Sequence, residues 1–278
     1  MSNPLLRVAL VQNRATPDSA ATVAALREQI REATRAGATL IALPEACEFL
    51  HGDTFEFARH ARTVEEHPAA HGLREAAREA CAWILVGSLS VRAANGQLAN
   101  RSILISPQGE IRATYDKINL FDAHPDDTQK ESLESRLYQR GATAVVVDIG
   151  PAVLGLTVCY DLRFPQLYRA LAQAGANVLT VPSAFHPVTG AAHWHTLLRA
   201  RAIETGCFVL APAQCGVPHA GRENFGHSLI VNPWGEIVAE AGIAPEVIVA
   251  DLDMSEVDAA RRRIPSILQN YEFSVTKA

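Results

Sequence analysis

The sequence predicts an α/β fold. Short apolar runs, typical of buried strands, alternate along the chain with segments of helical pattern, many of them rich in alanine. Turn signals at Asn95-Gly96 and Pro107-Gln108-Gly109-Glu110 add antiparallel hairpins to this alternation. With 278 residues, 48% of them hydrophobic, and no linker or low-complexity tract, the chain favours one domain.

The expected elements follow from their boundary residues. Asp18 or Ser19 caps the first helix, Gly37 closes it, and Pro44 ends the strand that follows. Strands are expected at 7–12, 39–43, 83–89, 98–106, 111–115, 144–149, 152–159, 175–181, 207–211, 228–231, 236–239 and 247–251. Helices are expected at 18–35, 72–81, 166–174, 194–204 and 255–263, the last capped by Ser255.

Two segments show no clear periodicity. Residues 46–68 have mixed helical and loop character, and residues 121–140 are polar and irregular. The second segment is longer than an ordinary connection, and such loops are usually functional or disordered.

Composition excludes several functional classes. A net charge of −5 and a pI near 6.1 provide no basic surface for nucleic acid. No signal peptide or membrane-length apolar run is apparent, so a soluble protein is expected. The five cysteines are scattered and form no Cys-x-x-Cys pair, which favours a reducing cytoplasm and argues against zinc chemistry. His186, His193 and His195 do not predict a metal site, because residues two apart on a helix face different directions.

Three chemically different residues follow expected strands. Glu45 comes after 39–43, Lys117 after the second hairpin, and Cys159 ends the run 152–159 just before a helix. The carboxyl ends of parallel strands are where α/β sheets bind ligands. A cysteine that attacks an amide needs a base and an oxyanion donor, which a glutamate and a lysine can supply. Taken singly, each residue is more often structural: such a cysteine usually packs in the core, and a lone glutamate or lysine is usually solvated at the surface.

The segments around these residues resemble the signature blocks of the nitrilase superfamily of carbon–nitrogen hydrolases. The blocks are Leu43-Pro44-Glu45, 116–121 and 158–165. The resemblance continues in the family's order through 182–185, 193–194, 199–204, 226–228 and 232–235.

The resemblance implies a four-layer α-β-β-α sandwich, formed by a single domain over residues 1–278. It also implies a homodimer, with residues from about 255 to 278 as a dimer-contact tail, and no cofactor or metal. The implied triad is Glu45 as general base, Lys117 as oxyanion stabiliser and Cys159 as nucleophile. The N–H of Tyr160 would join Lys117 in the oxyanion hole.

The family also uses a second glutamate after the lysine. The spacing to Gly141 maps it to Glu134, with Glu131 as a rival that has the same Glu-Ser dipeptide; Arg140 stands where the family commonly has proline. Arg163, Phe185 and His186 are candidates for substrate binding. For Arg163 the sequence leaves two roles open, an ion pair with Asp161 and contact with a substrate carboxylate.

The resemblance is strongest to the Nit branch, and within it to deaminated glutathione amidases. Phe225, where tyrosine is expected, and His186-Pro187 depart from their pattern. The expected activity is hydrolysis of a small carboxylated amide to acid and ammonia through a thioester. The alternatives are ω-amidase action on 2-oxoglutaramate, hydrolysis of an N-carbamoyl amino acid and, in another class, a partner-binding protein with weak catalysis.

Overall fold

Two six-stranded sheets form the framework of the protein. The computed structural model describes residues 5–124, 132–217 and 223–277. The first sheet has the order β16-β1-β2-β3-β4-β5. Its strands are β16 (Glu246–Asp253), β1 (Leu5–Gln12), β2 (Leu40–Ala42), β3 (Trp83–Arg92), β4 (Leu98–Ile105) and β5 (Ile111–Asp116). The strands β1, β2 and β3 are parallel, and the others in this sheet join by antiparallel pairing.

The second sheet has a parallel centre as well. Its order is β15-β14-β11-β10-β9-β8, with β9, β10 and β11 parallel. The strands are β15 (Ile237–Glu240), β14 (Leu229–Val231), β11 (Phe208–Ala211), β10 (Val178–Thr180), β9 (Val153–Leu156) and β8 (Val145–Asp148). Short pairs outside the two sheets are β6 (Asp122–Ala123) with β7 (Ser132–Leu133), and β12 (Cys215–Gly216) with β13 (Asn224–Phe225).

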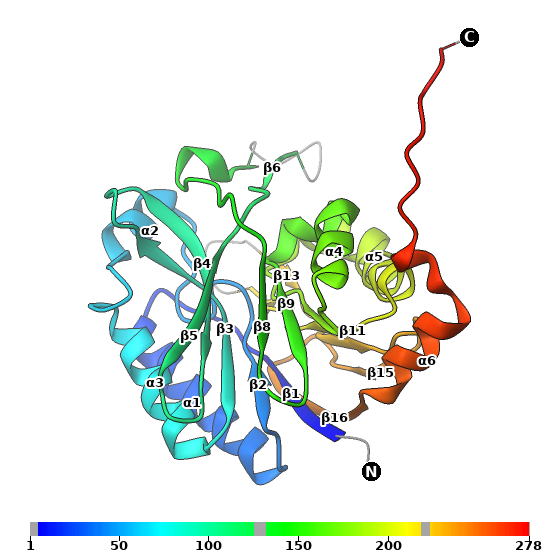
Figure 1. Cartoon of the computed structure of the whole chain (residues 1–278). Helices are drawn as coiled ribbons and strands as arrows, with labels where there is room; N and C mark the ends of the chain where they lie inside the picture. Colours follow the sequence, from blue (N-terminus) through cyan, green and yellow to red (C-terminus); the bar gives the residue numbers. More distant parts are fainter. Residues whose placement is uncertain (1–4, 125–131, 218–222, 278) are drawn as a thin grey trace.

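Helices cover the outer face of each sheet, as Figure 1 shows. Helices α1 (Ser19–Arg35) and α3 (Pro68–Ala80) bury Leu26 and Leu73 against residues such as Ile41 of the first sheet. The opposite face of that sheet shares one apolar core with the second sheet, which α4 (Pro165–Gln173) and α5 (Pro187–Thr205) cover. This order of helix, sheet, sheet and helix confirms the expected α/β class.

Most helix boundaries that were predicted from capping residues agree with the structure. The Asp18 carboxylate accepts a hydrogen bond from the N–H of Ala21 at 3.0 Å, and Gly37 follows the helix with φ of 84°. The cap predicted at Ser255 is wrong: Ser255 is already the first residue of α6 (Ser255–Arg263), and its N–H donates to Asp253 at 2.9 Å. Asp253 therefore satisfies one of the backbone N–H groups of the first turn, which have no partner within the helix.

Two helices start earlier than the predicted residues 72 and 194. Helix α3 begins at Pro68 and α5 at Pro187. In both, proline takes the first helical position, where its missing N–H costs nothing. The irregular segment 46–68 contains the short helix α2 (Thr54–His60), and residues 134–136 of the long loop form a 3₁₀ turn, η1 (Glu134–Arg136).

The C-terminal end leaves the body of the molecule. After the 3₁₀ turn η3 (Pro265–Leu268), the chain runs away from both sheets as an extended segment (Figure 1). Among the described helices, none is both long enough and apolar enough to cross a membrane.

Candidate active site

The three residues singled out in the sequence converge between the two sheets. Glu45 follows β2, Lys117 follows β5, and Cys159 opens the 3₁₀ turn η2 (Cys159–Arg163) after β9. The Lys117 Nζ lies 2.9 Å from Glu45 Oε1, and all three side chains are buried. Residues far apart in the sequence therefore form one compact site.

Glu45 is held by three separate donors. Its Oε1 accepts from Lys117 Nζ and from Asn100 Nδ2, both at 2.9 Å. Its Oε2 accepts from the N–H of Ala184 at 2.9 Å. Because each contact comes from a different segment, the carboxylate has one defined orientation.

Glu134, the residue assigned from the sequence as the second glutamate, also lies in this cluster. Its Oε2 lies 2.8 Å from Lys117 Nζ, and its Oε1 accepts from Asn100 Nδ2 at 2.8 Å. The N–H of Phe121 also donates to Oε2, at 2.6 Å. Glu131, the alternative, lies outside the described residues.

Asn100 is a site residue that sequence reasoning missed. It bridges the two carboxylates of Glu45 and Glu134. The sequence signal was weak, because Asn100-Arg101-Ser102 forms a polar run in the otherwise apolar strand β4 and nothing local distinguishes Asn100 from its neighbours.

Cys159 sits on a strained corner. Its φ of 47° is in the left-handed region, which is uncommon for a residue with a side chain and costs about 1–3 kcal/mol. The Cys159 N–H donates to Pro182 at 2.9 Å, and the carboxylate of Asp161 accepts from the N–H of Val158 at 2.9 Å. The chain is thus fixed on both sides of the sulfur.

Asp161 ties this corner to the segment that carries Lys117. Its Oδ2 accepts from the Tyr115 hydroxyl at 2.7 Å. Its Oδ1 accepts from the backbone and side-chain N–H groups of Asn119, at 2.9 Å and 2.8 Å. Among the described contacts it has no ion pair with Arg163, so the first of the two roles considered for Arg163 is wrong.

The electrostatics favour an ionised Glu45 beside a protonated thiol. Burial raises the pKa of Glu45. The positive charge of Lys117 and the hydrogen bonds from Lys117, Cys159 and Ala184 outweigh this effect, so the pKa of Glu45 is lowered. Burial and the neighbouring Glu45 raise the pKa of Cys159. For Lys117, burial opposes the charge, yet Glu134 and Glu45 hold its pKa well above the usual value. The resting arrangement is a carboxylate base, a thiol and an ammonium.

The other predicted site residues lie in the turn that Cys159 opens and at the start of α5. The Tyr160 ring meets Phe121 edge-on at 5.1 Å, and the Arg163 guanidinium lies over the rings of Tyr160 and Phe185 at 5.8 Å and 5.5 Å. Arg163 also contacts Nδ1 of His193 at 3.3 Å. His186 is the N-cap of α5, and its Nδ1 accepts from the N–H of Val188 at 3.3 Å.

His193 and His195 have different partners, and the other cysteines lie apart from Cys159. His193 faces Arg163, whereas His195 bonds Glu240 at 2.9 Å, so the two do not form one cluster. Cys47, Cys207 and Cys215 are buried, as expected for packing residues, but Cys81 is exposed at the end of α3.

Comparison with known protein families identifies the family of this chain. A model of the carbon–nitrogen hydrolase family matches residues 7–262. The chain belongs to this family. Human deaminated glutathione amidase is 39% identical to this hydrolase over 268 residues, which cover 93% of this chain and 80% of the human protein. The Yersinia enterocolitica protein of the same name is 37% identical, with coverage of 96% and 93%.

Solved structures agree with the family. The Caenorhabditis elegans NitFhit protein superposes with a TM-score of 0.88 at 32% identity, covering 97% of this chain and 66% of its own. Yeast Nit3, a member of branch 10 of the nitrilase superfamily, has a TM-score of 0.85 at 28% identity and coverage of 94% for both chains. An amidase mutant from Nesterenkonia, modified by fluoroacetamide at its active-site cysteine, has a TM-score of 0.78 at 29% identity and covers 93% of this chain and 94% of its own. The expected membership of the nitrilase superfamily is confirmed.

Proposed function

We propose that this hydrolase is a cysteine-dependent amidase that acts on deaminated glutathione or a closely similar carboxylated amide. The observation that carries this proposal is the contact of Lys117 with both Glu45 and Glu134 next to the buried thiol of Cys159. The named relatives, at 37–40% identity over most of the chain, support the substrate class.

In the first step, Glu45 takes the proton of the Cys159 thiol as the sulfur attacks the amide carbonyl carbon. The lowered pKa of Glu45 keeps it ionised for this role, and the raised pKa of Cys159 means that the thiol ionises only as it reacts. The carbonyl oxygen becomes an oxyanion, stabilised by the Lys117 ammonium and the N–H of Tyr160. That N–H lies in the first turn of η2, where backbone donors lack partners within the helix.

In the second step, the protonated Glu45 donates its proton to the leaving nitrogen, ammonia departs, and a thioester remains on Cys159. Glu45 then deprotonates a water molecule that attacks the thioester carbonyl. The carboxylic acid leaves, and the proton returns to the sulfur. Glu134 and Asn100 position Lys117 and Glu45 throughout.

Arg163 is the proposed partner for a carboxylate of the substrate. Arg163 is half-buried at the end of the turn that Cys159 opens, and its guanidinium contacts two aromatic rings and the exposed His193. A planar guanidinium with no carboxylate partner among the described contacts suits a carboxylated ligand. The proposed compartment is the cytoplasm, which the five free cysteines of the described structure support.

The substrate is tested by ammonia release from deaminated glutathione, 2-oxoglutaramate and an N-carbamoyl amino acid under matched conditions. The proposal expects the highest kcat/KM with deaminated glutathione, and an Arg163→Leu variant with raised KM for it. If the protein hydrolysed 2-oxoglutaramate or the N-carbamoyl amino acid with a higher kcat/KM, that compound would replace deaminated glutathione as the proposed substrate. Feeble turnover of all three would favour a partner-binding role.

A further inference from the structure

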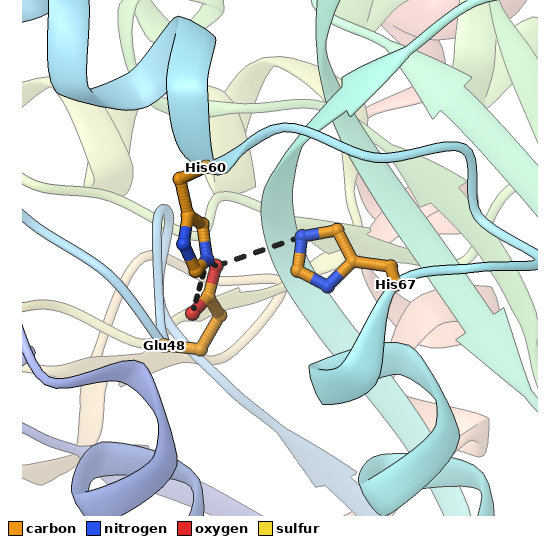
Figure 2. A group of neighbouring side chains, drawn as sticks. All are labelled: Glu48, His60 and His67. Atoms are coloured by element: carbon orange, nitrogen blue, oxygen red, sulfur yellow. Dashed lines mark hydrogen bonds and ion pairs between the residues drawn. The ribbon is translucent and has the colours of Figure 1, made fainter.

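A second group of titratable side chains begins three residues after Glu45. It consists of Glu48 from the loop that follows Glu45, His60 from the last turn of α2 and His67 at the start of α3 (Figure 2). His60 Nε2 lies 3.0 Å and 3.1 Å from the two oxygens of Glu48, and His67 Nε2 lies 3.8 Å from Glu48 Oε1. The three ligand atoms lie within 4.8 Å of one another.

His67 has an environment that protein contacts do not explain. Its side chain is 0% exposed, yet neither ring nitrogen makes a hydrogen bond to any described residue. Leaving such a group unsatisfied costs about 1–3 kcal/mol. An imidazole nitrogen can bind a metal ion through its lone pair. The side chain points toward Glu48 and His60 in Figure 2, and a ligand placed between the three residues would satisfy it.

The spacing of the three atoms suits a tetrahedral metal. Metal–nitrogen and metal–oxygen bonds of about 2.0–2.2 Å place two ligand atoms of a tetrahedron about 3.3–3.6 Å apart. The two measured separations, 3.0 Å and 3.8 Å, bracket this range. Two imidazoles and one carboxylate are a ligand set for zinc and similar transition metals, whereas calcium and magnesium prefer oxygen alone.

We propose that Glu48, His60 and His67 form a binding site for one Zn²⁺ ion per chain. The fourth position is open to water, because His60 is 24% exposed while Glu48 and His67 are buried. Ser19 donates a hydrogen bond to Glu48 Oε2, which orients the carboxylate from outside the cluster. This site is separate from the amidase chemistry and does not depend on the proposed function.

A bound ion would link the segment between Glu45 and α3 at three points. This segment carries Phe49, Leu50 and Phe57, which pack together in a small apolar cluster that Leu137 also contacts. Leu137 follows the η1 turn of Glu134, so the cluster touches both loops that flank the active site. The metal would therefore stabilise the loops rather than take part in the reaction.

A second cluster in the protein provides a matched control. His195 and His227 both bond Glu240 Oε1 at 2.9 Å. Its side chains are about one-third exposed, and both imidazoles already have a partner there. It lacks the buried, unsatisfied imidazole on which the zinc assignment rests.

The test is zinc binding by purified full-length protein after treatment with a chelator. Binding is measured by metal analysis and by competition with a zinc-sensitive dye, with Cys159→Ala as the parent so that the active-site thiol cannot bind the metal. We expect one Zn²⁺ per chain, and affinity reduced more than about 100-fold in His67→Ala and in His60→Ala. His195→Gln should bind as tightly as the parent. Co²⁺ in the same site should give the visible absorption of a tetrahedral ion, lost in the same two variants.

Thermal unfolding shows whether a variant that fails to bind zinc is still folded. With zinc at 100 times its Kd, the unfolding equilibrium of the parent should shift about 100-fold toward the folded state, and the Tm should rise. A cooperative thermal transition of each variant without metal shows that the variant is folded. If His67→Ala does not fold, the zinc affinity of His60→Ala, which changes a partly exposed position, decides whether the site exists. Absence of zinc binding in the parent, or equal binding in the parent and the folded variants, would overturn the assignment.

Discussion

Lys117 connects the two carboxylates of the active site, and its burial makes those contacts strong. The Nζ lies 2.9 Å from Glu45 and 2.8 Å from Glu134, with the side chain only 2% exposed. Charge pairs in such a site are screened far less by solvent than surface pairs are. The ammonium therefore keeps Glu45 ionised, as the proposed base must be, and remains charged for its proposed role beside the oxyanion.

Replacing Glu45 tests its role as base. Glu45→Gln should lower kcat by about 10²–10⁴-fold, because the amide cannot take the thiol proton. Since the pKa of Glu45 is lowered from 4.5, the wild-type acid limb of kcat/KM should lie below pH 4.5. Activity is present above that limb and lost as pH falls through it. The measurement is a pH–rate profile, with circular dichroism at each pH to confirm folding.

The exposed Glu65→Gln is the matched control and should leave the profile unchanged. A near-wild-type rate in Glu45→Gln, or a wild-type acid limb near neutral pH, would contradict the assigned base.

At the residue scale, the sequence predicted the meeting of Glu45, Lys117 and Cys159 because each follows a strand that enters the centre of the fold. Glu134 required the family's spacing, since the irregular loop around it has no periodicity from which to infer a position. Asn100 was missed because a buried polar residue inside a strand is recognised only when its partners are known. Its two hydrogen bonds go to residues 55 and 34 positions away.

The strands act on the site through close backbone contacts. Gly87 in β3 lies against the turn that follows β2: a Cβ there would come within 2.1 Å of the Leu43 carbonyl oxygen and 2.3 Å of that of Pro44. Both residues precede Glu45 directly. The position of Glu45 therefore depends on the absence of a side chain at Gly87 in the neighbouring strand.

Gly87→Ala should displace this turn. We expect a loss of about 1–3 kcal/mol or more in the free energy of unfolding, since the clash involves backbone that cannot rotate away. A fall in kcat should accompany it, because Glu45 moves with the turn. Urea denaturation and steady-state kinetics measure the two effects.

Gly242→Ala is the control, because a Cβ there would make only an ordinary 3.5 Å contact with Glu246. If Gly87→Ala were as stable and active as Gly242→Ala, the close contact would not position the site.

Strand and helix types were largely predictable at the element scale, because apolar runs and capping residues are local signals. The first residues of the helices were less predictable, because α3 and α5 begin at prolines that the apolar pattern alone does not mark. The short helix α2 was also hidden, since its buried phenylalanine, Phe57, packs in a small cluster rather than in a main core, and Phe55 is exposed.

For the whole molecule, the single domain over residues 1–278 and the dimer contact of residues 255–278 stay predictions. The C-terminal tail is consistent with an interface, because Tyr271, Phe273 and Val275 are 80%, 87% and 87% exposed. Large apolar side chains gathered on an extended segment are costly in water and favour burial against a partner.

Deleting residues 269–278 should therefore shift the protein from dimer toward monomer. Sedimentation velocity over a concentration series measures this shift, and the double substitution Tyr271→Ser with Phe273→Ser should act in the same direction. A monomeric full-length protein, or a deletion variant that dimerises as well as the full chain, would show that the tail makes no such contact.

The most direct test of the account is ammonia release from deaminated glutathione by wild type, Cys159→Ala and Cys81→Ser. Cys81 is the exposed cysteine at the end of α3 and controls for general thiol effects. We predict wild-type turnover in Cys81→Ser and essentially none in Cys159→Ala. Turnover that persists near the wild-type rate in a folded Cys159→Ala protein would contradict the central claim that this thiol is the nucleophile.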